Sequence, residues 1–214
     1  MSKLIELTLF PYFKTFAEKN NLTLVPTREQ NHYPDLTFID TADHKFAVDL
    51  KTTYRDAENP NKVSTMTLGA FTGYFRKRDS TKNVSFPYGA YSGHFVLGVI
   101  YSRALLKADE LRTFSLAELG DIPSVVKNLQ FFAQPKYRIA NDRPGSGNTK
   151  NIGAVRRVPE LLNGTGPFAS LGEKAFDDYW MYYLTSDMAR GVELTKPPYN
   201  NIGTYLEYKK TGTR

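Results

Sequence analysis

The sequence predicts a mixed α/β domain, in which helices flank a central mixed sheet. A continuous apolar run with β-branched members at residues 95–101 is typical of a central strand that is buried on both faces. Apolar and polar residues alternate over residues 45–50, which indicates a half-buried strand. Apolar residues at helical spacing over residues 4–19 predict a helix. At 214 residues, the chain is long enough to bury such a core.

The first expected element is the helix over residues 4–19. Leu4, Leu7 and Phe13 lie at spacings that place them in one apolar stripe. Pro11 falls inside this span, and proline lacks the amide hydrogen that a helix interior uses. The helix is therefore expected to kink or restart at Pro11.

A hairpin is expected next. Residues 36–39 read as a short apolar strand, and residues 40–43 (Asp-Thr-Ala-Asp) supply turn formers ahead of the alternating strand. A turn centred near Ala42 sets Asp35 opposite Asp49 to within one residue of register.

Four further elements complete the expected fold. They are a mixed aromatic and basic helix over 68–78, turns and a short helix over 105–127, a strand over 131–139 and a helix around 176–188. The sequence has no internal repeat, so residues 1–214 are expected to form a single domain with residues 105–128 as a candidate dimerisation appendage.

Asp35, Asp49 and Lys51 are the candidate catalytic residues. Facing residues of a hairpin have Cβ atoms about 4.5–5.5 Å apart, and two carboxylates at that distance repel unless a cation lies between them. Mg²⁺ is suited to such a site because it binds oxygen ligands and keeps several waters. Lys51 shares a face with Asp49, where it can stabilise negative charge on a phosphorane-like transition state or help deprotonate the attacking water.

This pattern predicts metal-dependent phosphodiester hydrolysis. The alternative is that Asp49 and Lys51 form only the solvated face of an edge strand, since short motifs of this kind often match by chance.

Three segments carry a resemblance to a known family. They are residues 30–35 (Gln-Asn-His-Tyr-Pro-Asp), 48–54 (Val-Asp-Leu-Lys-Thr-Thr-Tyr) and 145–153 (Gly-Ser-Gly-Asn-Thr-Lys-Asn-Ile-Gly). With shorter matches in the same order over nearly the whole chain, they resemble the EcoRV-like type II restriction endonucleases, of the PD-(D/E)xK nuclease superfamily. The resemblance implies Mg²⁺-dependent hydrolysis of both strands of double-stranded DNA at GATATC with a blunt cut, with Mn²⁺ able to replace Mg²⁺ and without a small-molecule cofactor.

The resemblance also implies roles for individual residues. Asp35, Asp49 and Lys51 fall on the family's catalytic acid, acid and lysine, with the two carboxylates as metal ligands. Glu6 matches a further acidic residue that is catalytic and near the metal, although its sequence context alone suggests a carboxylate on a helix surface.

The Gly-rich loop over residues 145–151 is a candidate DNA reader. Glycines let the backbone approach base edges, and an Asn amide can bind adenine in a bidentate manner, although such loops are often ordinary turns. By resemblance this loop enters the major groove, and a second loop lies near the minor groove and backbone. The candidate DNA contacts are Gly145, Ser146, Gly147, Asn148, Thr149, Lys150, Asn151, Gln30, Asn31, His32, Thr52, Thr53 and Lys82.

Some of these positions depart from the family or have a simpler interpretation. The family carries Thr where this chain has Lys150 and Gln where it has Glu29, so the phosphate contacts of both loops are expected to differ. Basic residues over 76–82 form either a phosphate-contacting edge or a solvated helix end.

Composition agrees with this prediction. A formal charge of +6 and a pI near 9.3 suit a polyanionic partner, although many cytoplasmic domains are equally basic. The absence of cysteine excludes disulfides and Cys-based zinc sites, and three scattered histidines argue against a His-rich metal site. The N-terminus is charged too early for a signal peptide, and no apolar run reaches about 18 residues, so a cytoplasmic, bacterial-type enzyme without membrane contact is expected.

Cutting both strands of a palindrome requires two active sites, so a homodimer is expected. The resemblance begins after an N-terminal segment of the family that contributes to dimerisation, which leaves the familiar dimer surface in doubt. The leucines at 105, 106, 111, 116 and 119 form either an interface patch or ordinary packing against the domain's own sheet. The alternatives are a monomeric nickase or repair nuclease of the same superfamily, and a non-catalytic DNA-binding protein.

Overall fold

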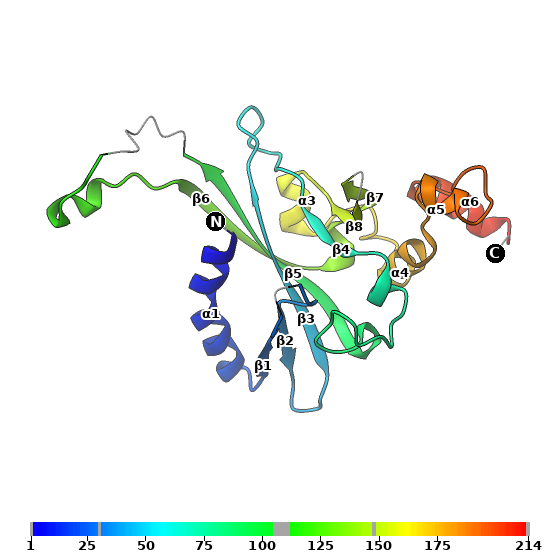
Figure 1. Cartoon of the computed structure of the whole chain (residues 1–214), viewed down its shortest axis with the longest axis horizontal. Coiled ribbons are helices and arrows are strands. Elements are labelled where there is room, and N and C mark those ends of the chain that lie inside the picture. The colour runs from blue at the N-terminus through cyan, green and yellow to red at the C-terminus, as the bar shows by residue number, and fades with distance from the viewer. Residues whose placement is uncertain (1, 30, 105–111, 147–148, 213–214) are drawn as a thin grey trace.

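A five-stranded mixed sheet forms the centre of the molecule (Figure 1). The computed structural model describes residues 2–29, 31–104, 112–146 and 149–212. The strand order is β1-β2-β3-β5-β6, in which β3 and β5 are parallel and the other neighbours antiparallel. The predicted mixed sheet flanked by helices is confirmed. Its strands are β1 Thr23–Pro26, β2 Leu36–Ile39, β3 Lys45–Tyr54, β5 Tyr91–Arg103 and β6 Val126–Pro135.

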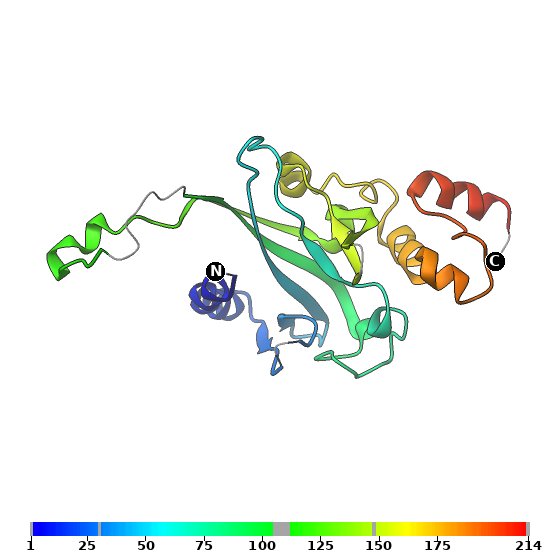
Figure 2. The same ribbon diagram turned by 45° about the horizontal axis from the view of Figure 1, so that its top comes forward.

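The remaining elements lie mostly on one side of this sheet, and helix α1 Ser2–Lys19 lies on the other (Figures 1 and 2). A second, three-stranded sheet has the order β4-β8-β7. Its strands are β4 Thr67–Ala70, β7 Ala140–Ser146 and β8 Thr149–Ala154. The helices are α2 Lys136–Ile139, α3 Val158–Asn163, α4 Glu173–Tyr182, α5 Ser186–Arg190 and α6 Ile202–Lys210, with 3-10 helices η1 Gly73–Phe75, η2 Tyr88–Ala90 and η3 Leu116–Asp121.

Helix α1 is continuous through Pro11, so the predicted restart is wrong. Because Pro11 has no amide hydrogen, the Leu7 carbonyl lacks its helical hydrogen-bond donor. Pro11 and Leu7 are both exposed, so water can hydrate this carbonyl instead. Phe13 and Ala17 are buried against β2, while Leu4 and Leu7 are more than half exposed. The apolar stripe is thus only partly covered.

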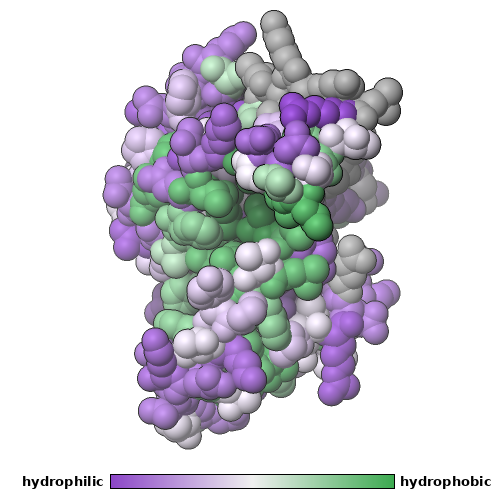
Figure 3. Space-filling view, turned by 90° about the vertical axis from the view of Figure 1, so that its left-hand side faces the viewer, coloured by the Kyte–Doolittle hydropathy of each residue, from purple (hydrophilic) through white to green (hydrophobic). Residues whose placement is uncertain are grey.

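An apolar groove lies between α1 and the sheet. Figure 3 shows it as a hollowed hydrophobic patch on the side of the molecule that carries α1. Aromatic side chains from four elements line it: Phe16, Phe38, Phe46 and Phe95.

Strand β5 confirms the predicted central strand, because the neighbouring residues Val99 and Ile100, which point to opposite faces of the sheet, are both buried. The predicted helix over 68–78 is wrong: the segment forms β4 and η1. Gly69 and Gly73 have φ of +88° and +58°, which a continuous right-handed α-helix over this segment would not allow.

Two other predictions are partly right. The strand expected over 131–139 ends at Pro135, and α2 begins at Lys136. The helix expected around 176–188 is divided into α4 and α5, because Thr185 caps α5 by accepting a hydrogen bond from the Met188 amide.

The described part of the connection between β5 and β6 that carries η3 projects away from the sheet (Figures 1 and 2). Its helix η3 contains no buried residue, and Leu116 and Leu119 are 87% and 55% exposed. These two leucines therefore do not pack against the domain's own sheet. Leu105, Leu106 and Leu111 lie outside the described residues. No helix in the described part of the chain is long and apolar enough to cross a membrane.

Candidate active site

The β2–β3 hairpin places Asp35 opposite Asp49. Leu36 pairs with Val48, and one further step along the two antiparallel strands sets Asp35 against Asp49. Asp35 accepts a hydrogen bond of 2.6 Å from the Leu50 amide through its Oδ2. The register expected from the sequence is confirmed.

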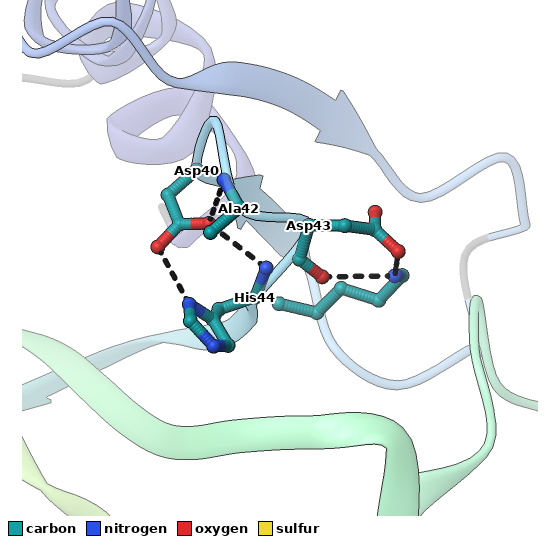
Figure 4. Close-up of polar contacts among 5 residues, drawn as sticks. Asp40, Ala42, Asp43 and His44 are labelled. Atoms are coloured by element: carbon teal, nitrogen blue, oxygen red, sulfur yellow. Dashed lines mark hydrogen bonds and ion pairs between the residues drawn. The ribbon is translucent and has the colours of Figure 1, made fainter.

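The turn of this hairpin is held by its own side chains (Figure 4). Asp40 Oδ1 accepts hydrogen bonds of 2.9 Å from the amides of Ala42 and His44. Asp43 has a φ of +63°, which Asp tolerates better than most residues, and Lys45 Nζ lies 2.9 Å from Asp43 Oδ2. These local contacts fix the pairing that brings the two catalytic candidates together.

Asp35 is also positioned through the chain that precedes it. The Tyr33 amide donates to the Asn83 carbonyl at 3.0 Å, and the Tyr33 carbonyl accepts from the Ser85 amide at 2.9 Å. The Tyr33 ring is buried, and its hydroxyl lies 2.9 Å from His94 Nδ1. Burial lowers the pKa of His94 well below its usual value, so this partner is a neutral imidazole at neutral pH.

Lys51 forms an ion pair with Asp49, with 2.8 Å between Nζ and Oδ2. Burial acts to lower the pKa of Lys51, but the negative charges of Asp49 and its neighbours outweigh it, and the pKa is raised. Lys51 is thus a cation at neutral pH.

The two carboxyl groups, Asp35 and Asp49, repel each other when both are charged. Burial of Asp35 and the charge of Asp49 raise the pKa of Asp35 to about 7. Asp49 is 5% exposed, and its Oδ2 has no hydrogen bond among the described residues, although it faces the Lys51 ammonium. A divalent cation between the carboxylates would relieve both features.

The donor set fits Mg²⁺. This ion is usually held by one or two carboxylates and completes its shell with water and phosphate oxygens. Asp35 and Asp49 supply two carboxylates. The described residues contain no group of three or more His, Cys, Asp or Glu side chains that could hold a metal ion, so Glu6 does not join them in a three-carboxylate cage.

Glu6 lies at the edge of the site. It projects from α1, where its carboxylate forms an ion pair of 2.9 Å with Lys3. Its charge contributes to the raised pKa of Lys51, and the pKa of Lys3 is raised mainly by Glu6 and in smaller part by Asp35. Glu6 and Lys3 on α1 therefore act electrostatically on the described residues of the site without a hydrogen bond to them.

Comparison with known proteins decides the family. The family model for restriction endonuclease EcoRV matches residues 1–210. The chain belongs to the EcoRV restriction endonuclease family. The type II restriction enzyme EcoRV of Escherichia coli is 36% identical over 217 aligned positions, which cover 100% of this chain and 84% of that enzyme.

The predicted resemblance is thus confirmed, and the chain is a site-specific deoxyribonuclease of a restriction system. DNA is the substrate of this family, and its members are in general dependent on a divalent metal.

The loop predicted to read bases connects β7 and β8 of the small sheet. Gly147 and Asn148 lie outside the described residues, and only the backbone pairing of Ser146 with Thr149 is described. A side chain at Gly145 would come within 2.7 Å of the Thr67 side chain, so this glycine is needed for close packing of the sheet. The last two residues of the predicted loop belong to β8, where Lys150 is exposed and Asn151 is half-buried.

The other predicted DNA contacts occupy different surroundings. Asn31 is exposed and His32 half-buried near the start of β2, while Gln30 lies outside the described residues. Thr52 is half-buried on β3, whereas Thr53 is 3% exposed and donates its hydroxyl to the Ser64 carbonyl at 3.0 Å.

The predicted basic edge is only partly available to DNA. Arg76 donates to the carbonyls of Phe71 and Tyr183, and Arg78 forms an ion pair with Asp177. Lys77 and Lys82 remain exposed and line one shallow groove. The predicted solvated helix end is wrong because no α-helix forms here.

The sequence did not indicate Lys136 as a residue of the site. Its side chain is 1% exposed and lies near Asp49 and Lys51, whose charges affect its pKa. The predicted strand over 131–139 gave no signal for this position, because a lysine in a strand usually lies on the solvent face.

Proposed function

We propose that this protein is a Mg²⁺-dependent type II restriction endonuclease that cuts both strands of GATATC and leaves blunt ends, with Mn²⁺ able to replace Mg²⁺. The observation that carries the proposal is the facing pair Asp35–Asp49 with Lys51 bound to it, in a chain of the EcoRV family. The family match over residues 1–210 supports the assignment of this geometry to one domain.

Asp35 and Asp49 would hold the metal, which supplies Lewis-acid stabilisation of the phosphate when bound. Water attacks phosphorus in line with the leaving oxygen. Because its pKa is raised, Lys51 acts as a cation that stabilises the growing negative charge and orients the attacking water, in preference to accepting a proton. Glu6 supplements the charge balance from the edge of the site.

Cleavage of a sequenced plasmid in the presence of Mg²⁺, followed by mapping of the ends, tests this function. We expect one cut at each GATATC site, with blunt ends and equal products from both strands. Binding to DNA without cleavage in Mg²⁺ or Mn²⁺ would instead support the non-catalytic alternative.

The loop between β7 and β8 would supply base recognition. Asn148→Ala is expected to lose about 1–3 kcal/mol of discrimination at one adenine of each half-site, the usual value of a bidentate Asn–adenine contact. Lys150→Ala should weaken binding of cognate and unrelated DNA alike and reduce its salt dependence, because a phosphate contact is independent of sequence.

Cleavage rates on duplexes that carry single-base variants of GATATC measure the first effect, and salt titrations of binding measure the second. An Asn148→Ala enzyme with the base preference of the wild type would contradict the role of the loop.

We also propose a homodimer whose interface includes the appendage over residues 105–128. Leu116 and Leu119 are exposed on the projecting η3, so their apolar surface is free to meet a second copy. The double variant Leu116→Asp/Leu119→Asp is expected to raise the dissociation constant of the DNA-bound dimer at least about tenfold, because buried apolar contacts dominate interface energy. Light scattering over a range of protein concentrations, with and without a GATATC duplex, measures this dissociation constant.

Leu206→Asp is a matched control, since Leu206 is 40% exposed on α6, away from η3. A wild-type protein that remains monomeric on DNA and nicks single strands would favour the nickase alternative.

A further inference from the structure

Lys136 is a buried ammonium enclosed by aromatic rings. Its Nζ lies 4.8 Å from the centre of the Tyr33 ring, 5.6 Å from that of Tyr88 and 5.9 Å from that of Phe75. Gly69 closes another side, because a side chain there would come within 3.6 Å of Nζ. Nζ has no hydrogen-bond partner among the described residues.

A charge in this place is costly to the fold. Burial without a hydrogen bond opposes the charged form, and cation–π contacts offset only part of that cost. A methionine of similar length would fill the same space without a charge. Packing alone therefore does not explain why the position holds a lysine.

The charges around Lys136 point to the active site. Burial lowers the pKa of Lys136 to about 8, and the largest charge effect against this is attraction to Asp49. Lys51, Asp177 and Arg78 act on it less strongly. The Tyr33 ring that covers the ammonium belongs to the segment that leads directly to Asp35. Lys136 is thus a cation at neutral pH that is shielded from solvent and attracted electrostatically by Asp49.

We propose that Lys136 is a buried electrostatic residue of the active site, which stabilises the negative charge of the transition state and opposes metal binding without touching the substrate. This inference rests on the proposed nuclease function. The low-dielectric surroundings make its charge effective over a distance at which an exposed lysine would be screened.

Removal of the Lys136 charge is expected to have opposite effects on metal binding and on the chemical step. A fixed positive charge repels a divalent cation, so its removal tightens metal binding. The same charge attracts the extra negative charge that develops on phosphate, so its removal slows the chemical step. A variant that merely disturbed the packing would weaken metal binding and turnover together.

Lys136→Met separates these cases. At about pH 7, below the pKa of Lys136, we expect kcat to fall about tenfold, with KM for DNA unchanged. Mn²⁺ should bind about threefold more tightly or better, measured by electron paramagnetic resonance without DNA. The melting temperature should not fall, since an unpaired buried charge is lost. Lys14→Met removes a solvent-exposed charge from α1 and should change none of these values.

Chemical rescue tests the charge itself. The chain has no cysteine, so Lys136→Cys introduces a unique thiol. Alkylation of the unfolded variant with 2-bromoethylamine displaces bromide and leaves a thioether with a terminal ammonium, whereas bromoethane leaves a neutral ethyl group. After refolding, the aminoethyl form should regain most of the kcat and the ethyl form should not. Comparison of the aminoethyl and ethyl forms also tests the role of the charge if Lys136→Met does not fold.

Wild-type kcat and Mn²⁺ affinity in Lys136→Met, or a decrease in both kcat and Mn²⁺ affinity, would overturn the proposal. Equal turnover by the two alkylated forms would do the same. If the wild type cuts no DNA with any divalent cation, the proposed function fails instead, and the Mn²⁺ affinities of the two proteins still report on Lys136.

Discussion

Asp49→Asn is expected to reduce Mg²⁺-dependent cleavage at least about a thousandfold, because loss of a ligand charge removes several kcal/mol of transition-state stabilisation. The substitution preserves the size of the side chain at a position that is 5% exposed, so the fold should remain intact. The ion pair with Lys51 is lost as well, which leaves that ammonium without its closest counter-charge. Single-turnover rates on a GATATC duplex, together with circular dichroism, measure the outcome.

Asp43→Asn is the matched control. Asp43 belongs to the same hairpin, but its side chain is 81% exposed and pairs with Lys45 at the turn. Asn tolerates the positive φ of this residue, so cleavage should stay near the wild-type rate. An Asp49→Asn enzyme within tenfold of the wild type would remove Asp49 from the site.

Asp35→Asn is expected to abolish cleavage and yet to stabilise the metal-free protein above about pH 7. Burial and the Asp49 charge raise the pKa of Asp35 to about 7, above its value in the unfolded chain. The wild type is therefore stabilised by the bound proton at low pH and loses this contribution as the pH rises through about 7. Asn carries no charge at any pH and can still accept the hydrogen bond from the Leu50 amide.

At about pH 8 the free energy of unfolding of Asp35→Asn should exceed that of the wild type by about 2–4 kcal/mol, since one pKa unit corresponds to about 1.4 kcal/mol. Below about pH 4, where Asp is protonated in the unfolded chain as well, the two proteins should converge. Urea unfolding in EDTA over this pH range measures the difference. A constant difference at all pH values would show that the charge of Asp35 is not its source.

The sequence predicted those parts of the fold that depend on local patterns. Alternation in β3 and turn formers at residues 40–43 together determine the hairpin register, and that register brings Asp35 to Asp49. The continuous apolar run in β5 likewise indicates the central strand, in which Val99 and Ile100 are buried on opposite faces. For these elements, the signal and the structure arise from the same few neighbouring residues.

Other features depend on contacts distant in sequence. The start of the segment expected to be helical forms strand β4 because it pairs with β8, about eighty residues further along the chain. Lys136 is buried by rings from Tyr33, Phe75 and Tyr88, which no local pattern reveals. Glu6 has the sequence context of a surface helix, and only the packing of α1 brings its charge close enough to raise the pKa of Lys51.

Binding of Mn²⁺ to the metal-free protein, followed by electron paramagnetic resonance without DNA, tests the central claim most directly. If Asp35 and Asp49 form the metal site, the wild type binds Mn²⁺, and both Asp35→Asn and Asp49→Asn weaken this binding at least about tenfold, since each removes one of two carboxylate ligands. Asp43→Asn should bind Mn²⁺ as the wild type does. Equal Mn²⁺ affinity in all four proteins would contradict a metal site between the facing carboxylates.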